Sequence, residues 1–129
     1  MDQAVLVEQQ QTDGRRLVEQ MDRDGVNPSV AVWYLYSDIG SWRLLLAGPQ
    51  LDLNNPQEAY ASIARSLSAL QPSAKSLSIA DVKVLSPSDP LLSALRTMIN
   101  TGKALSTIRM SNNFVNGFHI AEALAYRVT

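Results

Sequence analysis

The residues with the most obvious capacity for chemistry lie near the end of the chain, between Arg109 and His119. His119 is the only histidine among the 129 residues. It could act as a general base if a carboxylate such as Glu122 or Asp81 oriented it, because an imidazole titrates near neutral pH. A lone histidine cannot form a histidine-rich metal site. The simpler expectation is a histidine at the end of a hairpin, either exposed or hydrogen-bonded to a neighbour.

A polar cluster surrounds this histidine in a segment that is otherwise apolar. Its other members are Arg109, Ser111, Asn112, Asn113 and Asn116. An arginine can bind a carboxylate or phosphate through two parallel hydrogen bonds, and asparagine offers both donors and acceptors. The candidate site for a small anionic ligand therefore consists of Arg109, Asn112, Asn113 and His119. The alternative is that the asparagines only form turns, where they are common because they tolerate a left-handed backbone.

Motifs that define the common catalytic and metal sites are absent from the sequence. There is no cysteine, and therefore no thiolate metal site, no cysteine nucleophile and no disulfide. No glycine-rich phosphate loop, zinc-binding helix motif or serine nucleophile elbow occurs. The aspartates near turns and helix starts do not cluster as a divalent-cation site requires. We therefore expect no catalytic residue, no metal and no cofactor, and we favour a non-enzymatic protein over an enzyme.

Composition and charge indicate a single globular domain, which we place at residues 1–129. Hydrophobic residues make up 46% of the chain, a fraction typical of folded domains. The 11 lysines and arginines are balanced by 12 aspartates and glutamates, so the chain lacks the basic excess that binds nucleic acid or an anionic membrane surface. No apolar run is long enough to cross a bilayer, and the first residues do not resemble a secretory signal. These features predict a cytoplasmic protein.

The chain is organised around the segment Val30–Gly48, which contains both tryptophans and two of the four tyrosines. Two runs of β-branched, aromatic and aliphatic residues flank Ser37–Ser41, which has the serine, aspartate and glycine of a turn. This pattern predicts a β-hairpin. Both faces of its first strand are largely apolar, whereas a strand covered on one side only alternates with polar residues. We therefore expect this strand in the centre of the sheet, with helices on one face and another cover, such as a second protomer, on the other.

The aromatic residues of this hairpin allow two interpretations. They either fill the core, or they form a stacking platform for a ring ligand or the anchors of an interface. Core packing is the simpler interpretation, since single-strand binders also need a basic groove. For an interface, the candidate residues are Trp33, Tyr34, Tyr36 and Trp42.

Helix-start and helix-stop residues predict three helices, at residues 1–24, 56–70 and 90–99. In the first helix, Asp2 caps the start and Gly25 follows the end. The other two begin at Asn-Pro and Asp-Pro pairs, with Asn55 and Asp89 as the caps. We expect the first turns of the first helix to project beyond the core and to offer an apolar patch to a partner.

Three further strands complete the predicted sheet. Residues 76–85 alternate like a strand, with a slip near Ala80-Asp81 that indicates a bulge. Asn116-Gly117 is a strong signal for a second hairpin. The alanine-rich end of the chain also permits a helix, but we predict a strand because it lacks a helix cap and the turn needs a partner strand.

The position of the Asn-Gly turn also predicts the register of the second hairpin. The expected cross-strand pairs are Val115 with Phe118, Ser111 with Glu122, and Arg109 with Leu124. Asn112-Asn113 offers a competing turn that would change this register. Together the elements predict an α+β fold in the order α-β-β-α-β-α-β-β, with three helices packed on a mostly antiparallel or mixed sheet of about five strands.

Three segments carry a resemblance to known proteins. They read VAVWYLYSDIGSWRLLLAGP, QEAYASI and IRMSNNFVNGFHIAEALAYRV. Their pattern is an aromatic strand, a Trp-Arg-Leu strand ending at Gly-Pro, an Ala-Tyr helix and an Asn-Gly hairpin. It resembles a group of small uncharacterised bacterial α+β proteins with no assigned activity. The resemblance implies a bacterial, cytoplasmic, single-domain protein, and it brings no functional residue with it.

Two functions from different classes follow from these observations. The first is a non-enzymatic interaction or accessory domain that self-associates, as a homodimer or with another protein partner, and that binds neither nucleic acid nor membrane. The alternative is a small-molecule sensor or enzyme that uses the polar cluster of the second hairpin. That alternative requires the four candidate side chains to converge on one pocket.

Overall fold

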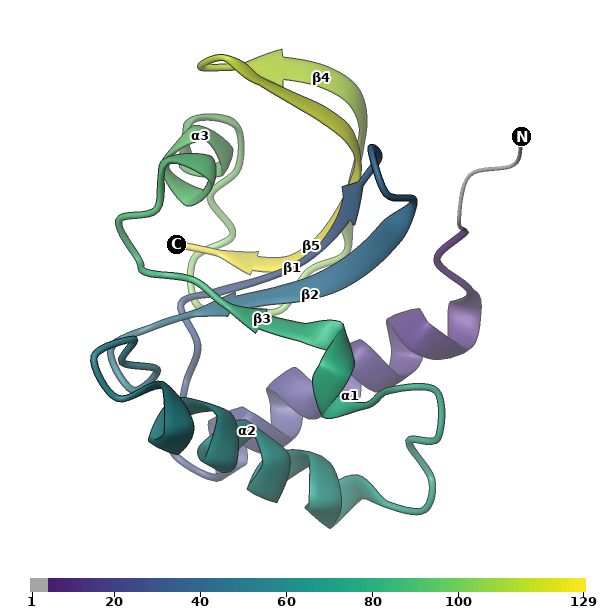
Figure 1. The fold of residues 1–129 in the computed structure, drawn as a ribbon, viewed down its shortest axis with the longest axis vertical. Coiled ribbons are helices and arrows are strands. Elements are labelled where there is room, and N and C mark those ends of the chain that lie inside the picture. The colour runs from purple at the N-terminus through teal and green to yellow at the C-terminus, as the bar shows by residue number, and fades with distance from the viewer. Residues whose placement is uncertain (1–4) are drawn as a thin grey trace.

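The computed structural model describes residues 5–129 and has an α+β architecture (Figure 1). Its elements are α1 (Glu8–Arg23), β1 (Val30–Tyr36), β2 (Ser41–Ala47), α2 (Pro56–Leu70), the 3₁₀ helix η1 (Ile79–Asp81), β3 (Val82–Val84), α3 (Pro90–Met98), β4 (Ile108–Val115) and β5 (Phe118–Val128). The predicted fold class and the predicted order of helices and strands are confirmed.

The five strands form one mixed sheet in the order β3-β2-β1-β5-β4. β1 lies in its centre, as predicted, and pairs antiparallel with β2 and β5. β4 is antiparallel to β5, whereas β3 is parallel to β2. The turn between β1 and β2 is one residue shorter than predicted, because Ser41 already pairs with Tyr36.

Helices cover both faces of this sheet. α1 and α2 pack on the face that carries Trp33 and Leu35 of β1. α3 packs on the opposite face, which carries Val32 and Tyr34, and the β4–β5 hairpin curves around it (Figure 1). The prediction of a covered second face is confirmed, but the cover is α3 of the same chain rather than a second protomer.

The first helix begins later than predicted. Its first residue is Glu8, and the predicted cap Asp2 lies outside the described residues. The side chain of Gln10 accepts a hydrogen bond from the Val7 N–H at 3.2 Å, which closes the helix start at this point. Leu6 is only 5% exposed, so part of the predicted N-terminal apolar patch is buried by the chain itself.

Both proline-initiated helices begin where predicted, but only one has the predicted side-chain cap. Asp89 accepts a hydrogen bond from the Leu91 N–H at 2.9 Å, and Pro90 is the first residue of α3. Asn55 precedes Pro56 of α2, yet its side chain makes no capping hydrogen bond. Its φ of −135° and ψ of 69° depart from the extended backbone that a capping side chain needs.

The predicted strand over residues 76–85 is wrong for most of its length. η1 replaces the expected bulge, and β3 is three residues long. The Asp81 carboxylate accepts a hydrogen bond from the Ser78 N–H at 2.9 Å, which closes the turn before β3. The N–H of Val84 donates to the hydroxyl of Tyr60 on α2 at 2.9 Å. A side chain of the same chain therefore occupies the outer edge of β3.

The second hairpin forms in the predicted register. Its turn residues Asn116 and Gly117 both have positive φ, at 49° and 83°. The three predicted pairs are present: Val115 with Phe118, Ser111 with Glu122, and Arg109 with Leu124. The end of the chain is a strand, as predicted. The competing turn does not form, and Asn112 instead has a φ of 52° inside β4.

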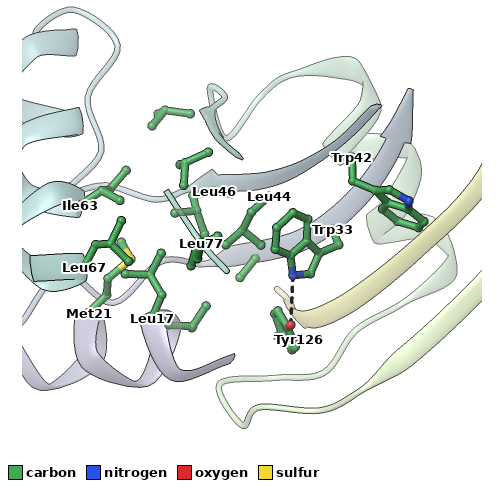
Figure 2. Close-up of a cluster of buried hydrophobic side chains, with 14 of the residues drawn as sticks. Leu17, Met21, Trp33, Trp42, Leu44, Leu46, Ile63, Leu67, Leu77 and Tyr126 are labelled. Carbon is green, nitrogen blue, oxygen red and sulfur yellow. Dashed lines mark hydrogen bonds between the residues drawn. The ribbon is translucent and has the colours of Figure 1, made fainter. Parts of the chain in front are cut away.

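Gly14 allows α1 to lie directly against the sheet. The indole N–H of Trp33 donates to the Tyr126 hydroxyl at 3.1 Å (Figure 2). That hydroxyl in turn donates to the backbone oxygen of Gln11, so one hydrogen-bonded chain joins β1, β5 and α1. A Cβ atom at Gly14 would lie 2.5 Å from Trp33 Nε1 and 2.9 Å from the Tyr126 hydroxyl oxygen. Only glycine leaves room for this junction.

Tyr126 makes the stability of this junction dependent on pH. Burial raises the pKa of Tyr126 well above its ordinary value of 10.0, against the opposing hydrogen bond from Trp33. Below pH 10 the hydroxyl is protonated in both the folded and the unfolded chain. Above that pH the unfolded chain loses the proton while the folded chain retains it, so the free energy of unfolding falls as the pH rises.

Tyr126→Phe is therefore expected to change both the stability at neutral pH and its decline in alkali. At pH 7 the variant should lose about 1–3 kcal/mol, because the buried indole N–H of Trp33 is left without its acceptor. Above pH 10 its free energy of unfolding should decline less steeply than that of the unmodified protein. Urea titrations over this pH range, followed by tryptophan fluorescence, measure both effects. Equal alkaline slopes in the two proteins would contradict the role given to Tyr126.

Candidate interaction site

The aromatic residues predicted to form an interface belong mostly to the core. Trp33, Tyr34 and Trp42 are 0%, 7% and 9% exposed. Tyr36 is partly exposed, with its ring 4.9 Å from that of Tyr34 and 5.1 Å from Nζ of Lys83. Because the first three side chains pack inside this chain, they offer no anchor to a partner in this conformation.

The four residues predicted to bind a ligand lie along one hairpin but do not converge on one cavity. His119 Nε2 and Asn112 Oδ1 are 2.9 Å apart. Arg109 lies at the other end of β4, where it donates to the side-chain oxygen of Gln11 at 2.8 Å. Asn113 pairs with Ile120, which is buried in the cluster that packs against α3. At about 3.3 Å per residue, Arg109 is about 16 Å along the strand from the residue that pairs with His119.

Two hollows of the described structure lie away from these four residues. One of about 480 Å³ is lined by Asn27, Pro28, Ser29, Lys103, Arg127 and Thr129. Another of about 370 Å³ lies against residues 48–54 and 86–87. Neither contains a histidine or a pair of carboxylates, and no group of three or more potential metal ligands occurs within residues 5–129. Neither hollow therefore holds a histidine-based or paired-carboxylate arrangement.

The guanidinium at the first hollow is already neutralised by an ion pair. Arg127 donates through both terminal nitrogens to the Asp22 carboxylate, at 2.8 and 3.0 Å. It also donates to the backbone oxygens of Pro28 and Lys103, each at 2.9 Å. All three of its nitrogens have an acceptor. The ion pair joins the end of β5 to α1, and these contacts engage four of the five N–H donors of Arg127 within this chain.

The outer edge of β4 is the longest open strand edge in the sheet. β4 is eight residues long and is the last strand in the sheet order, at the top of Figure 1. Within residues 5–129 its backbone hydrogen bonds go to β5. Its other side therefore presents the row of N–H and C=O groups with which a further strand can pair. We call this surface, Ile108–Val115 on the side away from β5, the β4 edge.

The opposite edge of the sheet is protected in ways that the β4 edge is not. β3 has only three residues, one of which is Lys83, and a tyrosine hydroxyl occupies one of its outward N–H groups. Short length, lysine and covering side chains are common means of blocking an edge. β4 contains neither lysine nor proline, and Arg109 is its only charged residue. Of the two sheet edges, β4 is therefore the one open to pairing.

Phe114 makes the β4 edge more apolar than the sequence analysis indicated. Its side chain is 77% exposed and stacks on His119, with ring centroids 4.5 Å apart and an interplanar angle of 18°. The bond from Asn112 holds the histidine in place beneath this stack. Sequence reasoning missed Phe114 as a site residue. The predicted register of the hairpin could have identified it. That register pairs Phe114 with His119, on the face opposite the pair Val115 and Phe118.

Comparison with known proteins gave no match to a family model, a curated protein or a solved structure. No helix within residues 5–129 has the length and apolar character required to span a membrane.

Proposed function

We propose that the protein is a non-enzymatic interaction domain that self-associates through the β4 edge. The observation that carries this proposal is the open eight-residue edge of β4, which ends beside the exposed Phe114. Addition of a strand to such an edge gives affinity through main-chain hydrogen bonds, and side chains on the two faces give specificity. Exposed aromatic residues are frequent anchors of interfaces.

A second copy is the occupant that this edge favours. An open edge is a site of uncontrolled pairing, and proteins close it or cover it. In a symmetric dimer the β4 edge of one copy pairs with the β4 edge of the other, so neither edge remains unpaired. The balanced charge of the chain also supports a protein partner rather than nucleic acid or a membrane surface. With this function we propose a bacterial cytoplasmic location, with which the cysteine-free sequence is compatible.

Light scattering at micromolar concentration tests the proposal directly, and we expect a particle of twice the chain mass. Phe114→Lys should raise the dissociation constant of the dimer by about tenfold or more, since it replaces an apolar anchor by a charge. Because this side chain is 77% exposed, the fold itself should be unaffected.

Ile39→Lys is the matched control for this experiment. Ile39 is 68% exposed but lies in the turn between β1 and β2, outside the β4 edge. The same chemical change there should leave the dimer intact. A wild-type protein that stays monomeric at every concentration, or equal effects of the two substitutions, would refute the β4 edge as the contact surface.

A further inference from the structure

The arrangement of side chains on β4 reads the same from either end. The residues on the face toward α3 are Ile108, Met110, Asn113 and Val115. The exposed residues on the other side are Arg109, Ser111, Asn112 and Phe114. From Ile108 to Ser111 the side chains therefore alternate between the α3 face and the exposed face, beginning on the α3 face. From Asn112 to Val115 they alternate again, beginning on the exposed face. The centre of symmetry of this order lies between Ser111 and Asn112.

The reversal lies at Asn112, whose backbone departs from regular strand geometry. A regular strand places successive side chains on opposite faces. Asn112 departs from this geometry with a φ of 52°, and its side chain bonds to His119 on the exposed face. The two halves of β4 are consequently out of phase with each other.

This reversal restricts which strand can pair along the whole of β4. Residues directly opposite each other in an antiparallel ladder have their side chains on the same face. A regular partner strand would match the faces of one half of β4 and mismatch the other half. A second β4 carries the same reversal, and an antiparallel arrangement brings the two reversals together.

Building on the proposed self-association, we propose that two copies pair antiparallel through β4 about a two-fold axis between Ser111 and Asn112. This register sets four kinds of pair between the copies: Ile108 with Val115, Arg109 with Phe114, Met110 with Asn113, and Ser111 with Asn112. Every pair joins side chains of the same face. Each kind of pair occurs twice in the dimer, because the contact is symmetric.

Two of these pairs are also chemically complementary. Ile108 and Val115 are both partly buried against the α3 core, and their pairing extends that core across the contact. Arg109 of one copy lies over Phe114 of the other, where a guanidinium is attracted to the face of an aromatic ring. The only charge on β4 thus meets the only strongly exposed aromatic residue of the same strand.

Cysteine cross-linking tests this register, because the chain contains no cysteine of its own. An Arg109→Cys protein carrying an affinity tag is mixed with an untagged Phe114→Cys protein under mild oxidation. Directly opposite residues have Cα atoms about 4.5–5.5 Å apart, within the range of a disulfide. We expect a disulfide-linked dimer containing both chains. Neither variant alone should cross-link, since two copies of one position lie about 16 Å apart along the ladder.

A pair of charge substitutions tests the Arg109–Phe114 contact by a second route. In this register Phe114→Lys places a like charge opposite Arg109, whereas Phe114→Glu places an opposite charge there. On dilution, the dimer of the lysine variant should dissociate at a protein concentration about tenfold higher than the dimer of the glutamate variant, because its dissociation constant is about tenfold higher. Ile39→Cys mixed with Phe114→Cys is the cross-linking control and should give no linked dimer.

The outcomes separate this register from the proposed function. A dimer whose Arg109→Cys and Phe114→Cys chains do not cross-link, or whose lysine and glutamate variants dissociate alike, would overturn the register and leave self-association standing. A wild-type monomer would overturn both. Cross-linking of the mixed variants together with a tighter glutamate variant would establish the two-fold pairing.

Discussion

Gly14→Ala is expected to lower the free energy of unfolding by about 1–3 kcal/mol, the range found when a packed core is overfilled. Alanine normally stabilises the interior of a helix relative to glycine by up to about 1 kcal/mol. Here the added methyl group would lie 2.5 Å from Nε1 of Trp33. Trp33 and Tyr126 are 0% and 1% exposed and are bonded to each other, so neither ring can move aside without breaking that bond.

Thr12→Ala is the matched control, because Thr12 lies in the same helix but is exposed. It should change the free energy of unfolding by no more than about 0.5 kcal/mol, since alanine only improves the helix propensity there. Urea denaturation of both variants, followed by far-UV circular dichroism, gives the comparison. A stability gain for Gly14→Ala would show that α1 does not pack on Trp33 and Tyr126 as described.

Short-range signals explain why much of the fold was predictable. The hairpin around Val30–Gly48 and the Asn116-Gly117 turn are each specified by residues close together in the chain. In both hairpins the strand residues next to the turn agree with it, so the turn fixes the register. The two apolar faces of β1 likewise predicted a central strand, because a strand that is buried on both faces has apolar residues on both faces.

Long-range contacts explain the parts that were not predictable. The hydroxyl of Tyr60 bonds to the backbone of Val84, 24 residues further along the chain, and helps to hold β3 as a short strand. No local sequence pattern near residues 76–85 predicts that contact. The element that covers the second face of β1 was unpredictable for the same reason, because α3 is distant from β1 in the sequence and contacts it only in the folded chain. A local pattern indicates that a face is covered, but it does not identify the covering element.

The candidate site was only partly predictable for the same reason. The sequence drew attention to the segment from Arg109 to His119, and the β4 edge lies within it. It could not show that Asn112 reverses the side-chain alternation, since the φ of 52° depends on the folded hairpin. Without that reversal Phe114 would lie on the same face as Met110. In the folded chain the most exposed apolar group of this segment is thus the Phe114 side chain, on the open edge of the sheet.

Asp22→Ala is expected to lower the free energy of unfolding by about 3 kcal/mol, because removal of one partner leaves a buried charge uncompensated. The remaining charge is the guanidinium of Arg127, whose side chain is 9% exposed, against 28% for that of Asp22. The lower end of the usual range applies, because water reaches part of this ion pair. The exposed pair Glu58–Arg65 supplies a control with a similar separation of 2.9 Å but side chains 63% and 65% exposed. Glu58→Ala should cost less than about 1 kcal/mol.

A double-mutant cycle shows whether the buried pair, rather than either residue alone, carries this effect. Arg127→Met keeps an apolar side chain of similar length at the end of β5 and removes the charge. Combined with Asp22→Ala, it should cost less than the sum of the two single changes by about 1–3 kcal/mol, since the second change removes a charge that the first had left unpaired. Chemical denaturation of the four proteins at neutral pH gives this coupling energy. Strict additivity would mean that Asp22 stabilises α1 by some other means, and that Arg127 is held in place by the backbone oxygens of Pro28 and Lys103 alone.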